Sequence, residues 1–284
     1  MKNIKKTILI TGGSGFIGQN LRNIDVTKYN TLYLSYKKKI KNVKKDKIVN
    51  INNIFNKVKK IDFIIHLAGS DDFYIKKGIK NNNIKLDKLI KKLVDHFSIK
   101  KIVFASSNRV YEGNKKNYIS ENSIVKPISV YAKSKLNTEK ILKKMKCKII
   151  ILRLPSVISK DFSKGLIFRV IRTLKKNKNL KIFNSQLPFN NIIFLENLIK
   201  IIIYSINFIE RKKTIINIAA VNPVKFINVI KYLVKMTKSK SKIIEDDSKS
   251  SLKHYSTKFQ NQLYKFKIFT VKNSLKKLFY RVKS

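Results

Sequence analysis

The sequence contains little cysteine, proline and glycine, and no tryptophan. Of its 284 residues one is cysteine, four are proline and eight are glycine. The single cysteine, Cys147, excludes a disulfide within the chain and is typical of a reducing compartment. Because glycine and proline are few, the chain has little room for linkers or low-complexity segments. We therefore expect a folded chain.

Long hydrophobic runs are also missing. After Lys5 and Lys6 the first apolar run covers only residues 7–11 before glycines follow, which is too short for a secretory signal. The isoleucine-rich segment 192–209 contains Glu196, Lys200 and several asparagines, so it does not fit a membrane span. These absences predict a soluble, cytoplasmic protein with no membrane partner.

Acidic residues are scarce. The chain has 16 Asp and Glu against 64 Lys and Arg, which gives a formal net charge of +48. A charge of this sign attracts nucleotide phosphates and occurs in proteins that bind nucleic acid or anionic membranes. The lysines are spread over the whole chain, whereas a nucleic-acid site gathers its basic residues with aromatic ones. This spread favours a compositional bias of the source genome, and nucleic acid is not an expected partner.

Short apolar runs alternate with helical patterns in the first half of the chain. The expected strands are residues 4–10, 31–34, 47–51, 63–66, 101–105 and 148–152. Apolar residues recur at helical spacing in residues 83–97 and 130–145. Six parallel strands with crossover helices describe an α/β fold with a doubly wound, Rossmann-type sheet.

The pattern changes after about residue 155. The segments with helical spacing are residues 165–175, 195–208, 225–237 and 271–280, and a strand is expected at residues 214–218. We expect a dinucleotide-binding domain in residues 1–155 and a smaller, mixed substrate lobe in residues 156–284. Such a lobe would cap the carboxyl ends of the strands, where open α/β sheets bind ligands.

A glycine-rich loop follows the first expected strand. Gly12, Gly15 and Gly18 form the pattern G-x-x-G-x-x-G, which includes Phe16 and Ile17 and leads into the polar start of a helix. Glycine is required because side chains would block the tight turn and the approach of the backbone to a pyrophosphate. The loop predicts a bound dinucleotide.

The end of the second strand bears on which dinucleotide binds. Many dinucleotide folds place an acidic residue there for the ribose hydroxyls. In this chain Ser35 is followed by Tyr36 and by three lysines beginning at Lys37. A hydroxyl followed by lysines suits a 2′-phosphate, so NADP is slightly favoured over NAD. The alternative is that the lysine run is only a solvated face.

Tyr131 and Lys135 form a Tyr-x-x-x-Lys pair. At positions i and i+4 they are neighbours on one helix face. An ordinary tyrosine has a pKa of about 10, and a nearby ammonium lowers it toward the range of a general acid/base. Upstream, the strand at residues 101–105 ends in Ser106 and Ser107, where a serine can hydrogen-bond the reacting oxygen of a substrate. The order of these motifs predicts a redox site.

These motifs resemble the extended short-chain dehydrogenases/reductases, in the NAD-dependent epimerase/dehydratase group that acts mostly on nucleotide sugars. The similarity spans nearly the whole chain. The matching segments are residues 11–18, 62–69, 83, 106–111, 131–135 and 152–155, with fainter matches in residues 190–198 and 217–219.

The resemblance implies a role for each matching position. Ser107 falls on the catalytic Ser/Thr, Tyr131 on the acid/base, and Lys135 on the residue that holds the ribose and tunes the tyrosine. Further implied cofactor contacts are Leu67, Ala68, Gly69, Asn50, Ile51, Asn83 and Pro155. The implied substrate contacts are Ser107, Asn108, Tyr131 and Asn190. No spacing of His, Cys, Asp or Glu indicates a metal site. The resemblance also implies a homodimer.

Several positions depart from the family pattern. Dehydratases of the family carry an acidic pair where this chain has Asn108 and Arg109, so elimination of water is not expected. The arginine that grips the nucleotide diphosphate falls near Asn190. These departures suit a divergent epimerase or a 4-keto-sugar reductase and leave the sugar open. Two alternatives remain: a reductase of a non-sugar carbonyl, and a non-catalytic dinucleotide-binding protein with nucleic-acid affinity.

Overall fold

The computed structural model describes residues 5–21, 28–35, 40, 43–69, 83–161, 165–246 and 252–279. The chain divides into two compact units. The first unit consists of residues 1–113, 125–153 and 199–216, and the second of residues 114–124, 154–198 and 217–284. The division therefore differs from a single boundary at residue 155, because residues 199–216 return to the first unit.

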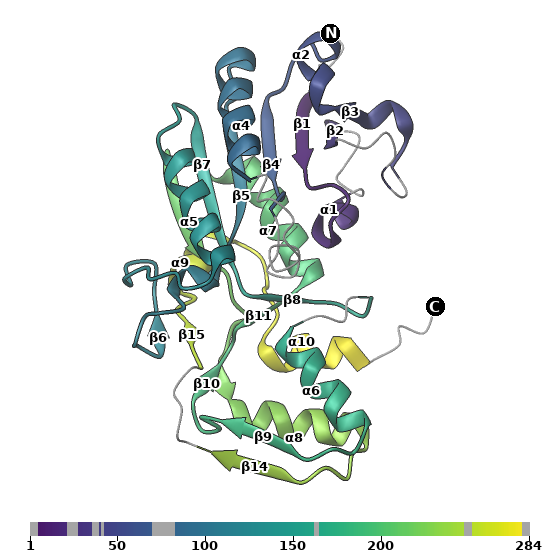
Figure 1. The fold of residues 1–284 in the computed structure, drawn as a ribbon, viewed down its shortest axis with the longest axis vertical. Helices are drawn as coiled ribbons and strands as arrows, with labels where there is room; N and C mark the ends of the chain where they lie inside the picture. Colours follow the sequence, from purple (N-terminus) through teal and green to yellow (C-terminus); the bar gives the residue numbers. More distant parts are fainter. Residues whose placement is uncertain are drawn as a thin grey trace. The chain divides into compact units, whose positions relative to one another are not determined.

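A seven-stranded sheet forms the centre of the first unit, in the order β12-β7-β5-β4-β1-β2-β3 (Figure 1). Its strands are β1 (Lys6–Thr11), β2 (Tyr29–Ser35), β3 (Ile48–Asn50), β4 (Phe63–His66), β5 (Lys101–Ser107), β7 (Lys148–Leu154) and β12 (Lys213–Asn217). The pairs β1/β2, β1/β4, β2/β3 and β4/β5 are parallel. The strand order reverses beside β1, which confirms the predicted doubly wound, Rossmann-type sheet.

The position of β12 corrects one expectation. A strand was expected at residues 214–218 as part of the second lobe, but Lys213–Asn217 lies at the edge of the main sheet beside β7. The backbone N–H of Ile149 donates to the carbonyl of Lys212 at 2.9 Å. Local apolar spacing identifies a strand but does not specify its partner, so the sequence could not place this one.

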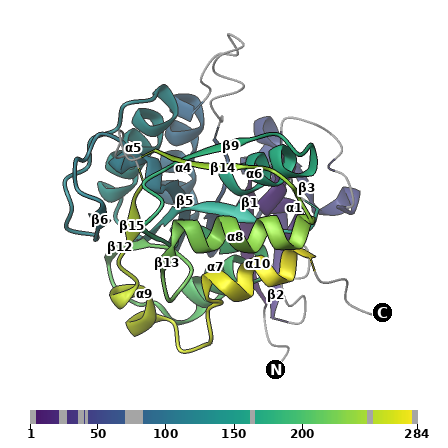
Figure 2. The ribbon, with the colours of Figure 1, turned by 90° about the horizontal axis from the view of Figure 1, so that it is seen from below.

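Helices cover both faces of the sheet (Figures 1 and 2). The longer ones are α4 (Asn83–Phe97), α5 (Val130–Lys143) and α7 (Leu195–Phe208). Ile102 and Phe104 of β5 join the core that contains residues of α4 and α5. Lys101 lies on the other face, where its Nζ donates to the carbonyl of Ile206 on α7. Because alternate strand residues face opposite sides, both faces of β5 are buried, as a run of apolar residues requires.

Short elements connect the strands of the first unit. They are α1 (Phe16–Asn20), η2 (Lys45–Lys47), η3 (Ile51–Asn53), α2 (Ile54–Lys57) and η4 (Asn108–Tyr111). Of these, α1 follows the glycine loop and η4 follows the carboxyl end of β5. Both therefore lie at the end of the sheet where open α/β folds bind ligands.

The second unit is built from helices and pairs of short strands. Its helices are α6 (Leu166–Lys175), α8 (Phe226–Thr237), α9 (Lys258–Leu263) and α10 (Val271–Phe279). The strand pairs are β6 (Tyr118–Ile119) with β15 (His254–Tyr255), β8 (Ser156–Ile158) with β11 (Ile192–Phe194), β9 (Leu180–Phe183) with β14 (Ile243–Asp246), and β10 (Pro188–Phe189) with β13 (Val224–Lys225). The apolar faces of α6 and α8 meet in one core, which includes Ile171 and Ile230.

Two kinds of feature are missing from the described part of the chain. None of its helices combines the length and the apolar character that crossing a membrane requires. Nor do the described residues contain a group of three or more His, Cys, Asp or Glu side chains placed to hold a metal ion.

Candidate active site

The glycine loop joins β1 to α1 in a tight turn, in which the backbone N–H of Gly15 donates to the carbonyl of Gly12 at 3.0 Å. Gly12 has a φ of 74°, and a Cβ there would lie 2.7 Å from the nitrogen of Ala68. A Cβ on Gly18 would lie 2.4 Å from the carbonyl oxygen of Gly12. Both positions require glycine because backbone packs against backbone. The half-buried Phe16 and Ile17 occupy the start of α1.

The segment after β4 is fastened to the start of this loop. Thr11 accepts hydrogen bonds at its carbonyl from the N–H of Leu67 (3.2 Å) and at its hydroxyl from the N–H of Ala68 (3.3 Å). Leu67 and Ala68 are half-buried and Gly69 is exposed. The structure thus brings together the predicted cofactor residues that follow β1 and β4.

His66 lies beneath these two loops in a buried polar network. Its Nδ1 is 2.7 Å from the hydroxyl of Thr11, and its Nε2 is 3.8 Å from a carboxylate oxygen of Asp87. The other oxygen of Asp87 accepts from the hydroxyl of Thr138 at 2.9 Å. Burial lowers the pKa of His66, so the ring is neutral at physiological pH. The network connects β1, β4, α4 and α5 and fixes the loops above it.

The outer strands hold the residues predicted to contact the adenosine end of the cofactor. Ser35 and Asn50 are register partners at the ends of β2 and β3. The carboxamide oxygen of Asn50 accepts from the N–H of Asn52 at 2.9 Å and begins η3, where Ile51 packs against the core. Lys37 lies outside the described residues. The backbone of Asn83 begins α4, and the prediction for its side chain lies outside the described part of the structure.

Lys135 is buried on α5 beside the end of β5. The side chain of Ser129 caps the helix by accepting from the N–H of Ala132 at 3.2 Å. Lys135 is 5% exposed, and its Nζ donates to the carbonyl of Ala105 at 2.8 Å. Burial lowers the pKa of Lys135 to about 8, against the opposing effect of the carboxylates of Asp87 and Glu139. The site therefore holds an ammonium group that loses its proton more readily than an ordinary lysine.

Tyr131 lies beside this ammonium group, and Ser107 ends the strand to which the ammonium group binds. The Nζ of Lys135 is 5.9 Å from the centroid of the Tyr131 ring. Ser107 ends β5, two residues after the carbonyl that Lys135 binds, and its hydroxyl accepts from the N–H of Arg109 at 3.2 Å, which begins η4. Asn108 is buried in the same turn. The structure thus gathers the three predicted catalytic residues at the carboxyl end of β5.

Sequence reasoning missed a buried ion pair beneath these residues. Glu139 is 0% exposed and binds Arg153 of β7 through both carboxylate oxygens, at 3.0 and 2.7 Å. Ser106 donates to the same carboxylate, and Arg153 donates to the hydroxyl of Tyr111. Glu139 follows Lys135 at i+4, so helical spacing contained the signal that the two share a face.

Pro155 and Asn190 belong to the second unit. Pro155 is buried and follows β7 directly. Asn190 is 0% exposed, and its carboxamide pairs with the backbone of Tyr255, donating to the carbonyl at 2.8 Å and accepting from the N–H at 2.9 Å. Asn190 therefore holds β15 in place inside this unit.

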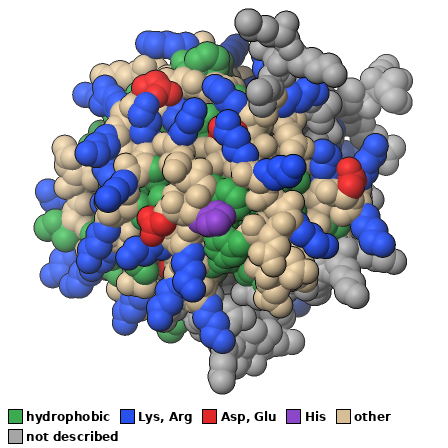
Figure 3. All heavy atoms as spheres, turned by 90° about the horizontal axis from the view of Figure 1, so that it is seen from above, with side chains coloured by type: hydrophobic (Ala, Val, Ile, Leu, Met, Phe, Trp, Pro, Cys, Tyr) green, Lys and Arg blue, Asp and Glu red, His purple; other side chains and the backbone are tan. Residues whose placement is uncertain are grey.

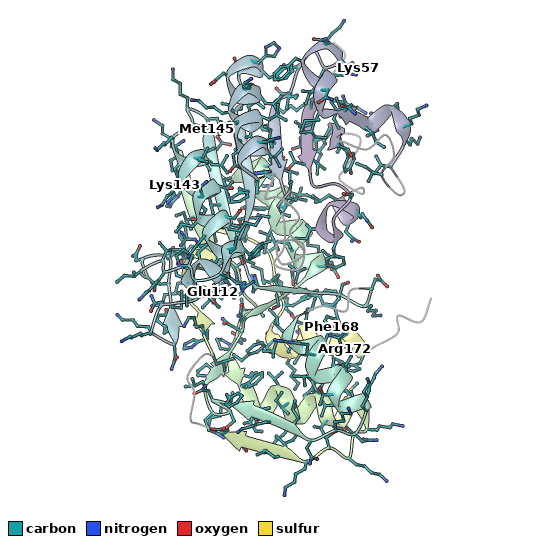
Figure 4. The ribbon with its side chains drawn as sticks, in the orientation of Figure 1. Lys57, Glu112, Lys143, Met145, Phe168 and Arg172 are labelled. Carbon is teal, nitrogen blue, oxygen red and sulfur yellow. The ribbon has the colours of Figure 1, made fainter. Side chains whose placement is uncertain are left out.

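A cavity of about 220 Å³ lies against α6 and β9 in the second unit. Its lining residues are Leu166, Arg169, Val170, Thr173, Leu180, Lys181, Ile182, Phe183, Phe226 and Leu252. Figure 4 labels Phe168 and Arg172 on the helix that forms one wall. Lys181 pairs with Asp246 at 2.6 Å, and its Nζ lies 5.6 Å from the centroid of the Phe183 ring. The cavity is apolar with aromatic rings and cations at its border.

Comparison with known proteins agrees with this arrangement. The family model "NAD dependent epimerase/dehydratase family" matches residues 8–219. A dTDP-D-glucose 4,6-dehydratase of Dictyostelium discoideum is 28% identical over 232 residues, 68% of this chain and 53% of that protein. An uncharacterised UDP-glucose epimerase, YtcB of Bacillus subtilis, is 27% identical over 68% of this chain and 70% of its own. The match spans about half the length of the first curated relatives.

Solved structures with the same fold cover nearly the whole chain. The Bordetella bronchiseptica enzyme WbmG, in complex with NAD, has a TM-score of 0.79 at 15% identity, over 98% of this chain and 94% of that chain. A UDP-N-acetylglucosamine 4-epimerase from Methanobrevibacter ruminantium M1, in complex with UDP-N-acetylmuramic acid, has a TM-score of 0.73 at 19% identity, over 97% of each chain. Fold, motifs and family match lead to one conclusion: the chain belongs to the NAD-dependent epimerase/dehydratase family of enzymes.

Proposed function

We propose that the protein is an NAD(P)-dependent epimerase or reductase that transfers hydride at a carbon of a nucleotide sugar, with Tyr131 as the acid/base. The observation that carries this proposal is the buried Lys135 beside Tyr131, at the end of the sheet that bears the glycine loop. An ammonium group there stabilises the phenolate that a tyrosine base requires.

The residues of the first unit fit a dinucleotide. Gly12 and Gly18 leave the turn free of side chains, so backbone can approach a pyrophosphate. Leu67 and Ala68 border the same loop. Ser35 is the last residue of β2, and its register partner Asn50 is the last residue of β3. When bound, the cofactor supplies the hydride-accepting and hydride-donating nicotinamide ring. Ser35 in place of an acidic residue favours NADP, whereas WbmG holds NAD.

Three side chains then handle the proton. The hydroxyl of Ser107 hydrogen-bonds the reacting oxygen of the sugar and orients it. The phenol oxygen of Tyr131 takes the hydroxyl proton when the sugar is oxidised and returns it when the ketone is reduced. Lys135, held by the carbonyl of Ala105, keeps a positive charge beside the phenolate and binds the ribose.

The residues after Ser107 bear on the type of reaction. Asn108 and Arg109 occupy the positions of the acidic pair of the dehydratases, so no carboxylate there assists the loss of water. This favours epimerase or reductase chemistry.

A ligand screen followed by one substitution tests the proposal. We expect a nucleotide sugar together with NADP or NAD to raise the melting temperature, because ligands that bind the native state stabilise it. Tyr131→Phe should then reduce turnover at least about 100-fold while leaving cofactor affinity unchanged. Cofactor titration separates the two chemistries, because an exchangeable NADP fits a reductase and a tightly held NAD fits an epimerase. Full activity of Tyr131→Phe would contradict the role of the tyrosine.

One observation favours a second candidate, a reductase of a non-sugar carbonyl. Asn190 stands near the position of the diphosphate-binding arginine, and its carboxamide is engaged by Tyr255. Turnover of simple ketones with NADPH, without stabilisation by any nucleotide sugar, would establish this candidate and replace the first.

A further inference from the structure

Arg109 is held beside Tyr131 by Glu112. The Nε of Arg109 donates to one carboxylate oxygen of Glu112, which is labelled in Figure 4. The other oxygen accepts from the backbone N–H of Ser129 at 2.9 Å and of Ile128 at 3.3 Å. Burial acts to raise the pKa of Glu112, but hydrogen bonds from Ser129 and Arg109 outweigh it and lower the pKa. Glu112 is therefore a charged anchor at neutral pH.

This anchor places a guanidinium group against the ring of Tyr131. The Cζ of Arg109 is 5.5 Å from the ring centroid, slightly closer than the 5.9 Å of the Lys135 ammonium. The two cations come from different elements, since Arg109 lies in η4 and Lys135 in α5. Arg109 is 44% exposed, so water screens its charge more than that of the buried Lys135.

Arg109 and Lys135 both place a cationic group within 6 Å of the centroid of the Tyr131 ring. A cation stabilises a phenolate more than a neutral phenol, and a partly screened charge several ångströms away changes the pKa of such a group by about one unit. Glu112 partly offsets the charge of Arg109, and the carboxylates of Asp87 and Glu139 act on Lys135 from α4 and α5. Arg109 thus adds a second cationic side chain beside the ring, which the sequence analysis did not predict.

We propose that Arg109 is a second cation of the site, which together with Lys135 stabilises the ionised form of Tyr131. The inference rests on the proposed function for its effect on turnover. The ionisation itself is a property of the folded chain and can be measured without substrate.

The test is an NMR titration of protein labelled with ¹³C at the Cζ of tyrosine, with the Tyr131 signal assigned by its loss in Tyr131→Phe. In Arg109→Gln the ionisation midpoint of Tyr131 should move up by about one pH unit. Arg109→Lys keeps the positive charge, so its Tyr131 midpoint should rise by no more than half as much as that of Arg109→Gln. Lys133→Gln is the matched control, because Lys133 is exposed on α5 two residues from Tyr131 and the substitution removes the same charge.

Turnover gives a second readout. If the proposed function holds, the pH at which kcat/KM reaches half its plateau should rise by the same amount in Arg109→Gln and stay unchanged in Lys133→Gln. Equal titration midpoints in the wild type and Arg109→Gln, or equal shifts in both glutamine variants, would overturn the inference. If the wild type showed no turnover while Arg109→Gln still shifted the Tyr131 midpoint as expected, the proposed function would be refuted and the inference about Arg109 would stand.

Discussion

At the scale of single residues, the chemistry of the site depends on a charge placed where water is excluded. The ammonium group of Lys135 donates a hydrogen bond to the carbonyl of Ala105, and the carboxylates of Asp87 and Glu139 act on it electrostatically. Burial favours the neutral amine, whereas Asp87 and Glu139 favour the ammonium. The balance lets the residue respond to its surroundings near the working pH of an enzyme.

This balance predicts how stability depends on pH. The pKa of Lys135 falls from 10.5 to about 8 on folding, so between these values the unfolded chain binds a proton that the folded chain has released. The free energy of unfolding should therefore rise with pH across this window, by at most about 3 kcal/mol. Urea denaturation at several pH values should show this rise in the wild type relative to Lys135→Met. If the free energy of unfolding depended on pH in the same way in both proteins, a lowered pKa of Lys135 would be contradicted.

Two glycines of the loop differ in what they tolerate. A Cβ at residue 18 would lie 2.4 Å from the oxygen of Gly12 and 2.7 Å from the Cα of Gly13, so Gly18→Ala must displace backbone. A Cβ at Gly15 would lie 3.2 Å from the same oxygen. We expect Gly18→Ala to lower the melting temperature of the cofactor-free protein by several degrees, and Gly15→Ala to lower it less, because only the first substitution must displace backbone. Equal losses would mean that the loop is not held by this packing.

At the scale of elements, α5 is fastened to the sheet by charges as well as by apolar packing. Glu139 of α5 and Arg153 of β7 form a buried pair to which Ser106 of β5 contributes a hydrogen bond. Pairs of this kind contribute little net stability, because desolvation offsets their attraction. In this protein the pair and its hydrogen bond hold the ends of β5 and β7 in place relative to α5, the helix that contains Tyr131.

The pair predicts opposite results for single and double substitutions. Glu139→Gln leaves the guanidinium of Arg153 buried without its counter-charge and should lower the free energy of unfolding by about 3–5 kcal/mol. Glu139→Leu combined with Arg153→Met removes both charges and should recover most of that loss. Chemical denaturation of the three proteins measures both effects. A double variant that is less stable than Glu139→Gln would show that the pair itself supplies the stability.

Elements also show how far the sequence predicts the fold. Buried strands such as β4 and β5 were found within two residues of their observed ends, because runs of Ile, Val and Phe are typical of strands covered on both faces. The partner of β12 and the paired short strands of the second unit were not found. Strands of two to four residues contain too little periodicity to be recognised, and their pairing depends on contacts between distant segments.

The candidate site was predicted best where a motif combines order with local spacing. The glycine loop and the Tyr131–Lys135 pair each lie within one segment, and in the structure the loop follows β1 while the pair lies on α5. The supporting residues Asp87, Thr138 and Arg153 come from separate elements and meet only in the folded chain. Asn190 was assigned to the substrate from its place in the sequence alone. That place did not reveal that its carboxamide binds the backbone of Tyr255.

At the scale of the whole molecule, the net charge of +48 acts on stability and on ligand capture together. Figure 3 shows Lys and Arg side chains distributed over the face it displays, with few acidic ones between them. Like charges that are crowded by folding repel one another, which destabilises the compact state. The same field raises the rate at which anionic nucleotides reach the surface.

Salt should therefore change stability and binding in opposite directions. Between about 0.01 M and 0.15 M ionic strength the Debye length falls from about 30 Å to about 8 Å, so repulsion among the lysines weakens and the melting temperature should rise by several degrees. Over the same range cofactor affinity should fall, and more for NADP than for NAD, because the 2′-phosphate adds negative charge. Sodium chloride and sodium sulfate compared at equal ionic strength provide the control. Screening predicts the same stabilisation by both salts, whereas a much larger effect of sulfate would mean that bound anions stabilise the fold and that diffuse repulsion does not.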